Sequence, residues 1–175
     1  MPALMLVNRL SEASIYLEGL PQLGRAEQIT LPEVKWKKSS TKGLGLLGEP
    51  TFPTQLEPMS AKIKWTCMYP EINLITLDPT NMVRLQVYGN LRTYGPMGLT
   101  GERPVVAFLR GWFPANKMGD FKAGENVETE CEMEVHYFKL LDTGAPVIEI
   151  DITANIYTVG EDDLMANMMA NLGLV

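Results

Sequence analysis

The chain has 175 residues, of which 46% are hydrophobic, and 21 acidic against 15 basic side chains give a net charge of −6. This length suits one domain with a sizeable core, and the hydrophobic content argues against a disordered chain. The negative charge argues against a conventional nucleic-acid-binding protein, and no apolar run approaches the ~20 residues of a membrane span, so no membrane insertion is expected.

The N-terminal third predicts short extended segments. Residues 13–18 alternate between apolar and polar side chains, which is typical of a strand. Residues 24–37 are also extended, but Pro32 lacks an N–H group, so this segment is an edge strand or is bulged there. After the proline, Lys35 and Lys37 share one face.

Residues 38–58 have three glycines, three prolines and no periodicity, which predicts an irregular loop. Disorder is one interpretation, but a solvated linker would avoid the apolar side chains present here. We therefore expect an interaction loop that buries them against a partner. The candidate contact residues are Leu44, Leu46, Leu47, Phe52 and Leu56.

The middle of the chain predicts further strands and one helix. Residues 59–68 alternate cleanly, with Lys62 and Lys64 facing away from the core. Residues 70–77 begin with proline and a glutamate, which favours a short helix, although Ile72, Ile75 and Thr76 also suit a strand. Residues 81–94 alternate again, and residues 103–113 are apolar on both faces, as in a central strand or an interface.

A strand with an acidic face is predicted at residues 126–141. Its glutamates are spaced two residues apart, so they share one face of the strand while apolar residues occupy the other. Neighbouring glutamates about 7 Å apart repel each other by roughly 0.6 kcal/mol in water. The acidic stripe, defined as Glu128, Glu130, Glu132 and Glu134, must therefore be hydrated or faced by cations.

Lysine rows are the candidate charge partners of the acidic stripe. They comprise Lys35 and Lys37, and Lys62 and Lys64, each with a period of two. The alternative is that both rows are ordinary solvated strand faces. Farther along the strand, Phe138 and Leu140 continue the glutamate face in apolar form, which predicts that the strand enters the core near His136.

The C-terminal part predicts one strand over residues 146–159 and a terminal arm at 161–175. In the strand, alternate isoleucines face inward: Ile148, Ile150, Ile152 and Ile156. In this C-terminal segment, apolar residues four apart indicate a short amphipathic helix and further contacts, at Leu164, Met168 and Leu172. The whole pattern predicts one mainly β domain over residues 1–175, a sandwich or barrel of two packed antiparallel sheets with a flanking helix.

The sequence offers little for catalysis. The single histidine, His136, stands beside carboxylates, but one histidine makes a poor zinc site, and no phosphate-binding loop or nucleophile elbow occurs. Cys67 and Cys131 have no metal-ligand spacing, and with no secretory signal they indicate reduced thiols in a protein made in the cytoplasm, with a disulfide as the weaker alternative. We expect no enzyme activity, no metal and no cofactor.

Several segments together resemble one family. They are ITLPEVKWK at 29–37 with GLGLLG after it, SAKIKW at 60–65, LRG at 109–111, YFKL at 137–140, VIEID at 147–151, and Asp163-Leu164 leading to NLGLV. In this order they resemble the major tail tube protein of contractile-tailed bacteriophages, which is also the tube of R-type pyocins. The resemblance covers nearly the whole chain, except that residues 66–100 match only in outline and neither cysteine corresponds to a family cysteine.

The resemblance implies a structural virion protein, made in the host bacterial cytoplasm, that forms stacked hexameric rings with a continuous inner β-barrel. It implies contacts with the sheath, tape-measure, baseplate and terminator proteins, and DNA that passes through without specific binding. Because DNA carries about one charge per 1.7 Å, a glutamate wall would repel it and let it slide. Alternatives are the tube of a pyocin or secretion machine without DNA, or a sugar-binding or hydrolytic β-sandwich.

Overall fold

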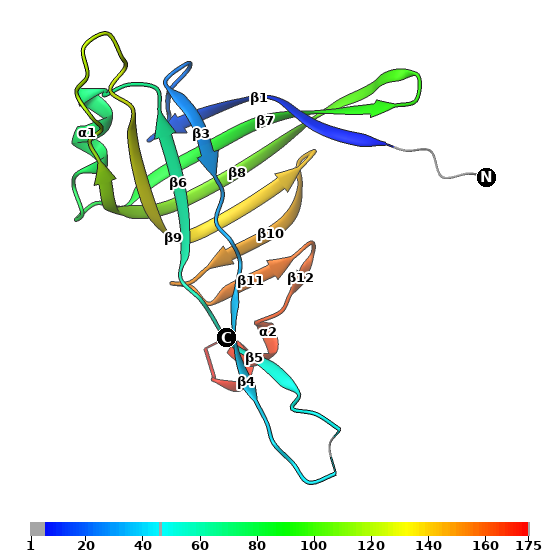
Figure 1. The fold of residues 1–175 in the computed structure, drawn as a ribbon. Helices are drawn as coiled ribbons and strands as arrows, with labels where there is room; N and C mark the ends of the chain where they lie inside the picture. The colour runs from blue at the N-terminus through cyan, green and yellow to red at the C-terminus, as the bar shows by residue number, and fades with distance from the viewer. Residues whose placement is uncertain (1–5, 46, 175) are drawn as a thin grey trace.

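A computed structural model describes residues 6–45 and 47–174 and shows a mainly antiparallel β fold (Figure 1). The elements in chain order are β1 (Val7–Leu17), β2 (Leu20–Pro21), β3 (Ala26–Thr30), β4 (Trp36–Ser40), β5 (Thr51–Leu56), β6 (Met59–Trp65), α1 (Pro70–Thr76), β7 (Val83–Gly95), β8 (Gly98–Lys117), β9 (Thr129–Asp142), β10 (Ala145–Asp151), β11 (Ile156–Val159), β12 (Asp162–Asp163) and α2 (Ala166–Asn171). No helix of the described residues is long and apolar enough to cross a membrane.

Ten strands form one sheet, whose main path runs β12-β11-β10-β9-β8-β7-β1-β2. The first half of β9 also pairs with β6, which in turn pairs with β3, so the sheet branches at β9. β3 and β6 cross in front of β1, β7 and β8 in Figure 1. The expected two packed layers are thus parts of one continuous sheet.

The core lies between these layers. Apolar residues that alternate with outward-facing ones form it on β1, β6, β7, β8, β9 and β10, as the alternation predicts. Its fully buried large side chains include Leu17 of β1, Ile63 and Trp65 of β6, Leu85 of β7 and Met133 of β9. Ile72 of α1 closes one end of the core, which confirms the predicted short helix.

The pairing of β8 with β9 is irregular near Gly111. The pairing shifts register between Arg110 and Gly111, leaving His136 as the extra residue of a bulge on β9. A Cβ atom at Gly111 would lie 1.9 Å from the backbone oxygen of Glu134. Only glycine therefore fits this crossing.

The expectation of an irregular loop over residues 38–58 is wrong in part. β4 and β5 pair as a two-stranded sheet, with Ser39 opposite Phe52, and form a hairpin that projects from the body (Figure 1). Most of its side chains are exposed on both faces. Because neither face is buried, the sequence has no apolar period that would reveal these strands.

The expectation of one strand over residues 146–159 is also wrong. The chain turns between β10 and β11, where the Asp151 carboxylate accepts hydrogen bonds from the backbone N–H groups of Thr153 and Ala154. Ile148 and Ile150 face the core as predicted, but Ile152 and Ile156 are exposed. An aspartate side chain that bonds to the following backbone favours a turn over a strand.

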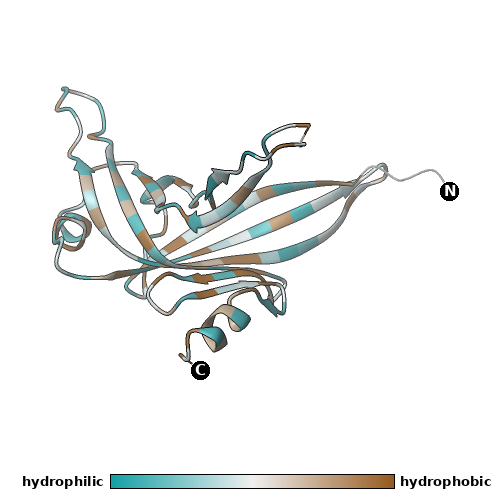
Figure 2. Cartoon of the chain, turned by 90° about the horizontal axis from the view of Figure 1, so that it is seen from below, coloured by the Kyte–Doolittle hydropathy of each residue, from teal (hydrophilic) through white to brown (hydrophobic). Residues whose placement is uncertain are grey.

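Three strands continue past the end of β9 to form a projection. β9 ends at Asp142, opposite Val105, whereas β8 extends back to Gly98, paired with β7, which pairs in turn with β1. We call this overhang, comprising residues 6–12 and 89–104, the arm. Figure 2 shows it extending away from the rest of the molecule.

The chain exposes more surface than a compact monomer would. Its accessible surface is 11802 Å². A compact monomer of 19.5 kDa is expected to expose about 8,500 Å². The excess area, on the order of 3,000 Å², is consistent with the projecting arm and hairpin. An exposed area of this size is typical of a subunit that buries surface in an assembly.

Candidate functional site

The acidic stripe lies on the face of β9 opposite the core, as the alternation predicts. Cys131, Met133 and Val135 are buried, whereas Glu130 is exposed and Glu132 and Glu134 are half-buried. Glu128 precedes the strand and is exposed. The stripe is therefore a surface feature of the isolated subunit.

Two of the four predicted lysines lie beside the stripe. On β6, Lys62 is paired with Glu132 and Lys64 with Glu130. Lys64 Nζ lies 3.0 Å from Glu128 Oε2 and 2.8 Å from Glu27 Oε2. Hydrogen bonds to Glu27 and Glu128 raise the pKa of Lys64 above its usual value, so it stays charged at neutral pH.

The stripe has a cation on its other side as well. On β8, Lys117 is paired with Glu130. Lys62, Lys64 and Lys117 thus lie on the strands next to the four glutamates, and the surface is closer to neutral than the glutamates alone suggest. Cross-strand opposite charges of this kind help to set the register.

The other two lysines do not face the stripe. Lys35 Nζ lies 2.9 Å from Glu33 Oε2, and the pKa of Lys35 is raised by this hydrogen bond. Lys37 is on β4 and exposed. Lys35 directly precedes β4 and Lys37 lies on it, and β4 belongs to a separate two-stranded sheet with β5, so neither lysine lies on a strand next to β9.

Phe138 and Leu140 lie in the core as expected, but for a different reason, and the outer face of β9 does not end at His136. The bulge at His136 shifts the alternation by one residue, so Phe138 and Leu140 pack in the core. The outer face continues with Tyr137 and Lys139. The expectation that Phe138 and Leu140 continue the glutamate face is therefore wrong.

Beyond the bulge, the outer face holds a polar network that the sequence did not reveal. Arg110 Nη2 lies 2.9 Å from Asp151 Oδ2, and the guanidinium is 5.4 Å from the ring centre of Tyr137. Lys139 Nζ lies 2.9 Å from Glu149 Oε2, and the Tyr137 hydroxyl donates to Glu149 at 2.9 Å. The network ties β8, β9 and β10 together.

Burial and hydrogen bonding shift the pKa values in this network. Burial raises the pKa of Tyr137 to about 12, and its bond to Glu149 adds to the shift. Burial alone would raise the pKa of Asp151, but bonds from Thr153 and Ala154 and the charge of Arg110 outweigh it and lower the pKa. The only sequence signal was Arg110 in an otherwise apolar strand.

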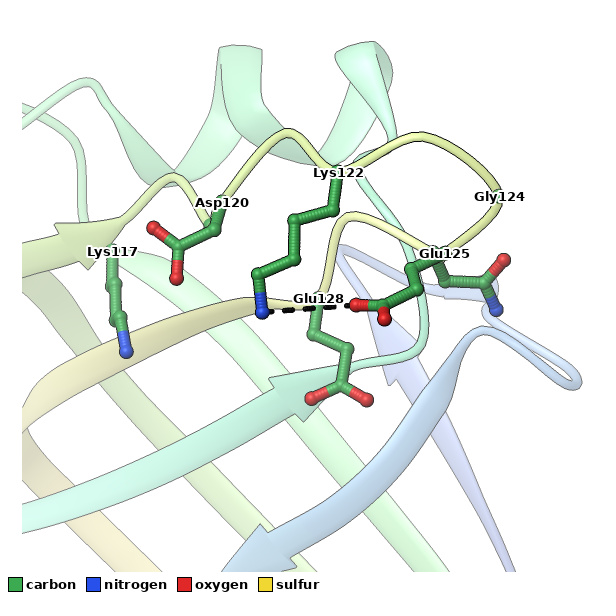
Figure 3. A pocket seen from close by; sticks show the side chains of 8 residues that line it. Lys117, Asp120, Lys122, Gly124, Glu125 and Glu128 are labelled. Carbon is green, nitrogen blue, oxygen red and sulfur yellow. Dashed lines mark ion pairs between the residues drawn. The ribbon is translucent and has the colours of Figure 1, made fainter.

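A polar hollow adjoins the stripe at the β8–β9 loop (Figure 3). Its volume is ≈ 570 Å³, and charged side chains of both signs line it, including Lys117, Lys122, Asp120, Glu125 and Glu128. Lys122 and Glu125 form an ion pair within the loop, with 3.8 Å between Nζ and Oε2. Among the described residues, no group of three acidic, histidine or cysteine side chains could hold a metal ion.

Most of the predicted contact residues are exposed. On the hairpin, Leu44 and Leu47 have relative exposures of 107% and 109%, and Phe52 is also exposed. In the C-terminal segment, the exposed contact residues are Leu164, Met168 and Leu172. Leu56 differs because it packs against the chain's own core, and Leu46 lies outside the described residues.

Both cysteines are free. Cys131 is buried and accepts a hydrogen bond from the indole nitrogen of Trp65 at 3.2 Å. Burial raises the pKa of its thiol to about 11. This environment makes Cys131 an unreactive structural thiol.

Comparison with known proteins identifies similar chains over nearly the full length. A family model described as "Phage tail tube protein FII" matches residues 7–173. The tail tube protein of Escherichia phage P2 is 25% identical over 171 residues, which is 95% of this chain and 97% of that protein.

Two solved structures of an extracellular contractile injection system share the fold. A chain of the PVC sheath/tube terminator in the extended state has a TM-score of 0.53 and 9% identity, covering 75% of this chain and 94% of that chain. A chain of the PVC sheath-tube complex has a TM-score of 0.52 and 10% identity, covering 74% and 88%.

Proposed function

Because the chain belongs to the phage tail tube protein FII family, we propose that it polymerises as stacked hexameric rings into the inner tube of a contractile tail. Membership makes it a structural component of the phage tail. The family match over residues 7–173 carries the proposal. The excess exposed surface supports it, because a subunit with neighbours at its sides and in adjacent rings needs several interfaces of about 800 Å² each.

The proposed partners follow from this role. Copies of the chain contact one another within and between rings. The sheath and terminator proteins surround and end the tube, in keeping with the sheath, tube and terminator of the injection system whose fold is shared. Baseplate proteins, a tape-measure protein inside the tube, and DNA in transit complete the set.

Electron microscopy of the purified chain tests the assembly. We expect stacked rings with six-fold symmetry and a central channel, at protein concentrations where the exposed apolar surfaces can associate. A protein that stays monomeric at high concentration, or that shows a ligand cleft in place of a ring, would contradict the proposal.

We further propose that the acidic stripe faces the channel. The lysines beside it leave this surface with a small net negative charge, which avoids both trapping and strong repulsion of a polyanion. The glutamates of the acidic stripe keep the net charge of this surface negative. Removing Glu130, Glu132 and Glu134 would leave Lys62 and Lys117 without their cross-strand carboxylates and free to bind phosphates, whereas Lys64 would keep its ion pairs with Glu27 and Glu128.

Charge neutralisation tests this wall. In the variant Glu130→Gln, Glu132→Gln, Glu134→Gln, tubes should still form, but DNA delivery should fall by roughly tenfold or more because the lysines hold the phosphates. The control Lys62→Gln should assemble and deliver DNA normally. Normal infectivity of the triple variant, with normal tubes, would show that the stripe does not line the path of DNA.

A further inference from the structure

The arm carries apolar side chains that no other described residue covers. Leu10, Met97 and Leu99 have relative exposures of 60%, 98% and 52%. The arm extends past the end of β9, so among residues 6–45 and 47–174 no strand pairs with residues 98–103 of β8 on that edge. An exposed apolar segment of this kind indicates a contact with another chain.

The arm also carries charged side chains that are in no ion pair among the described residues, Arg9 and, on the same strand, Glu12. Arg9 lies directly opposite Arg92 in the β1–β7 pairing, and like charges in this position repel each other. Arg92 is neutralised by Glu102, with 2.7 Å between Nε and Oε1. Within residues 6–45 and 47–174, Arg9 has no carboxylate at ion-pair distance, so an acidic surface from outside the subunit would relieve the repulsion.

A groove lies at the opposite edge of the sheet. It has a volume of ≈ 430 Å³ and lies between the base of the β4–β5 hairpin, the β10–β11 turn and α2. Its apolar lining includes Trp36, Ile152, Ile156, Tyr157, Met165 and Met168. We call it the edge groove.

Acidic residues adjoin the edge groove. Glu161, Asp162 and Asp163 are consecutive and exposed at β12, the last strand of the sheet. In the part of the chain that the structure describes, none of the three is in an ion pair. The edge groove therefore offers an apolar hollow beside negative charge, and the arm offers apolar side chains beside positive charge.

We propose that the arm of one subunit packs into the edge groove of the next copy in the ring. This inference rests on the proposed function, since a ring of identical subunits joined head to tail needs two different complementary faces. The arm, with β1, and the edge groove, with β11 and β12, lie on opposite edges of the sheet order. Met97 and Leu99 contact Met168 and Ile156, and Arg9 pairs with the acidic residues at β12.

The excess surface of the subunit is sufficient for this contact. An interface of standard size buries about 800 Å² on each partner, and each subunit would use one arm and one groove. The two faces together need roughly 1,600 Å², which is within the excess on the order of 3,000 Å² over a compact monomer. The remainder is available for contacts between rings and with the sheath.

Disulfide cross-linking tests the contact. The variant Met97→Cys, Met168→Cys is made with Cys67→Ser, since Cys131 is buried, and assembled tubes are oxidised. We expect a ladder of covalent oligomers on non-reducing gels, whereas each single cysteine variant should give no ladder beyond dimer. The pair Met97→Cys, Leu47→Cys serves as a matched control. Leu47 is more exposed than Met168, but it lies on the hairpin tip and not in the edge groove, so this pair should not cross-link.

The outcomes separate this inference from the proposed function. Tubes that form normally but give no ladder, or give one only for the Leu47 pair, would overturn the arm–groove contact and leave the tube intact. A wild-type chain that forms no rings would overturn the proposed function itself.

A charge exchange provides a second readout. Arg9→Glu should reduce the yield of tubes at least tenfold, and Asp162→Arg added to it should restore the yield. Arg9→Glu alone should not lower the melting temperature of the subunit, because it replaces the repulsion between Arg9 and Arg92 by an opposite-charge pair at an exposed position. Full assembly of Arg9→Glu, or no restoration in the double variant, would contradict the pairing.

Discussion

At the residue scale, Gly111 imposes the tightest steric limit on the sheet. A methyl group there would overlap the Glu134 carbonyl at the point where β8 and β9 cross. This crossing links the two layers, since β9 carries both β6 and β10. Glycine is therefore required here by the close contact with the Glu134 backbone. The hydrophobic pattern of the strand does not indicate it.

Gly111→Ala should destabilise the subunit by roughly 1–3 kcal/mol or more, because β8 and β9 must separate to admit the methyl group. Urea denaturation followed by circular dichroism measures this change. Gly101→Ala is the control, since its Cβ atom would meet nothing within 4 Å, and it should change stability by less than about 0.5 kcal/mol. Equal midpoints for the two variants would rule out the steric constraint.

At the element scale, Asp151 joins two neighbouring features. Its carboxylate ends β10 by accepting the turn hydrogen bonds, and it also pairs with Arg110 on β8. Loss of the charge of this buried side chain leaves Arg110 without a carboxylate partner, with only the Tyr137 ring beside its guanidinium. The register of β8, β9 and β10 therefore depends on a residue that the sequence presents as an ordinary outward-facing acid.

Asp151→Asn should destabilise the subunit by about 1.5–3 kcal/mol at neutral pH, the range for hydrogen bonds to charged groups. Because folding lowers the pKa of Asp151, its contribution is present above the unfolded value of about 3.9 and is lost as the pH falls through the folded pKa. Between about pH 5 and about pH 2, the melting temperature of the variant should therefore fall less than that of the wild-type chain.

Thermal unfolding followed by circular dichroism over this range measures both effects. Asp120→Asn is the matched control, because Asp120 is exposed in the β8–β9 loop and should leave stability near neutral pH within about 0.5 kcal/mol. If Asp151→Asn has the stability and the acid sensitivity of the wild-type chain, the charge of Asp151 does not stabilise the fold.

At the scale of the whole molecule, the projections define the chain as a subunit. The β4–β5 hairpin, the arm and α2 extend from one body and carry exposed apolar side chains (Figures 1 and 2). α2 has no buried residue of its own. Within the isolated chain these elements bury little apolar surface, so that surface is available for contacts with neighbouring copies or with the sheath.

The hairpin tip offers a test of this division between folding and assembly. Leu44→Ser, Leu47→Ser should leave the melting temperature of the subunit within about 2 °C, because both side chains are fully exposed, but should shorten or abolish tubes. Leu56→Ser, on the same hairpin, should instead lower the stability of the subunit, since Leu56 packs against the core. Tubes of normal length from the double variant would exclude the tip from assembly contacts.

The sequence by itself determined what depends on neighbours along the chain. Alternation placed Cys131, Met133 and Val135 in the core and Glu130, Glu132 and Glu134 outside, because side chains on a strand alternate whatever lies beside them. The same local pattern predicted α1 and the mainly β class. Ordered motifs over nearly the whole length indicated the family before any fold was known.

Only the tertiary structure decided which strands lie side by side. The lysine rows look alike in the sequence, yet β6 brings Lys62 and Lys64 beside the glutamates while Lys35 and Lys37 lie elsewhere. The bulge at His136, the pairing of Arg110 with Asp151 and the overhang of the arm likewise depend on register between segments far apart in the chain. Register follows from packing and backbone pairing across the sheet, and a local periodicity does not contain that information.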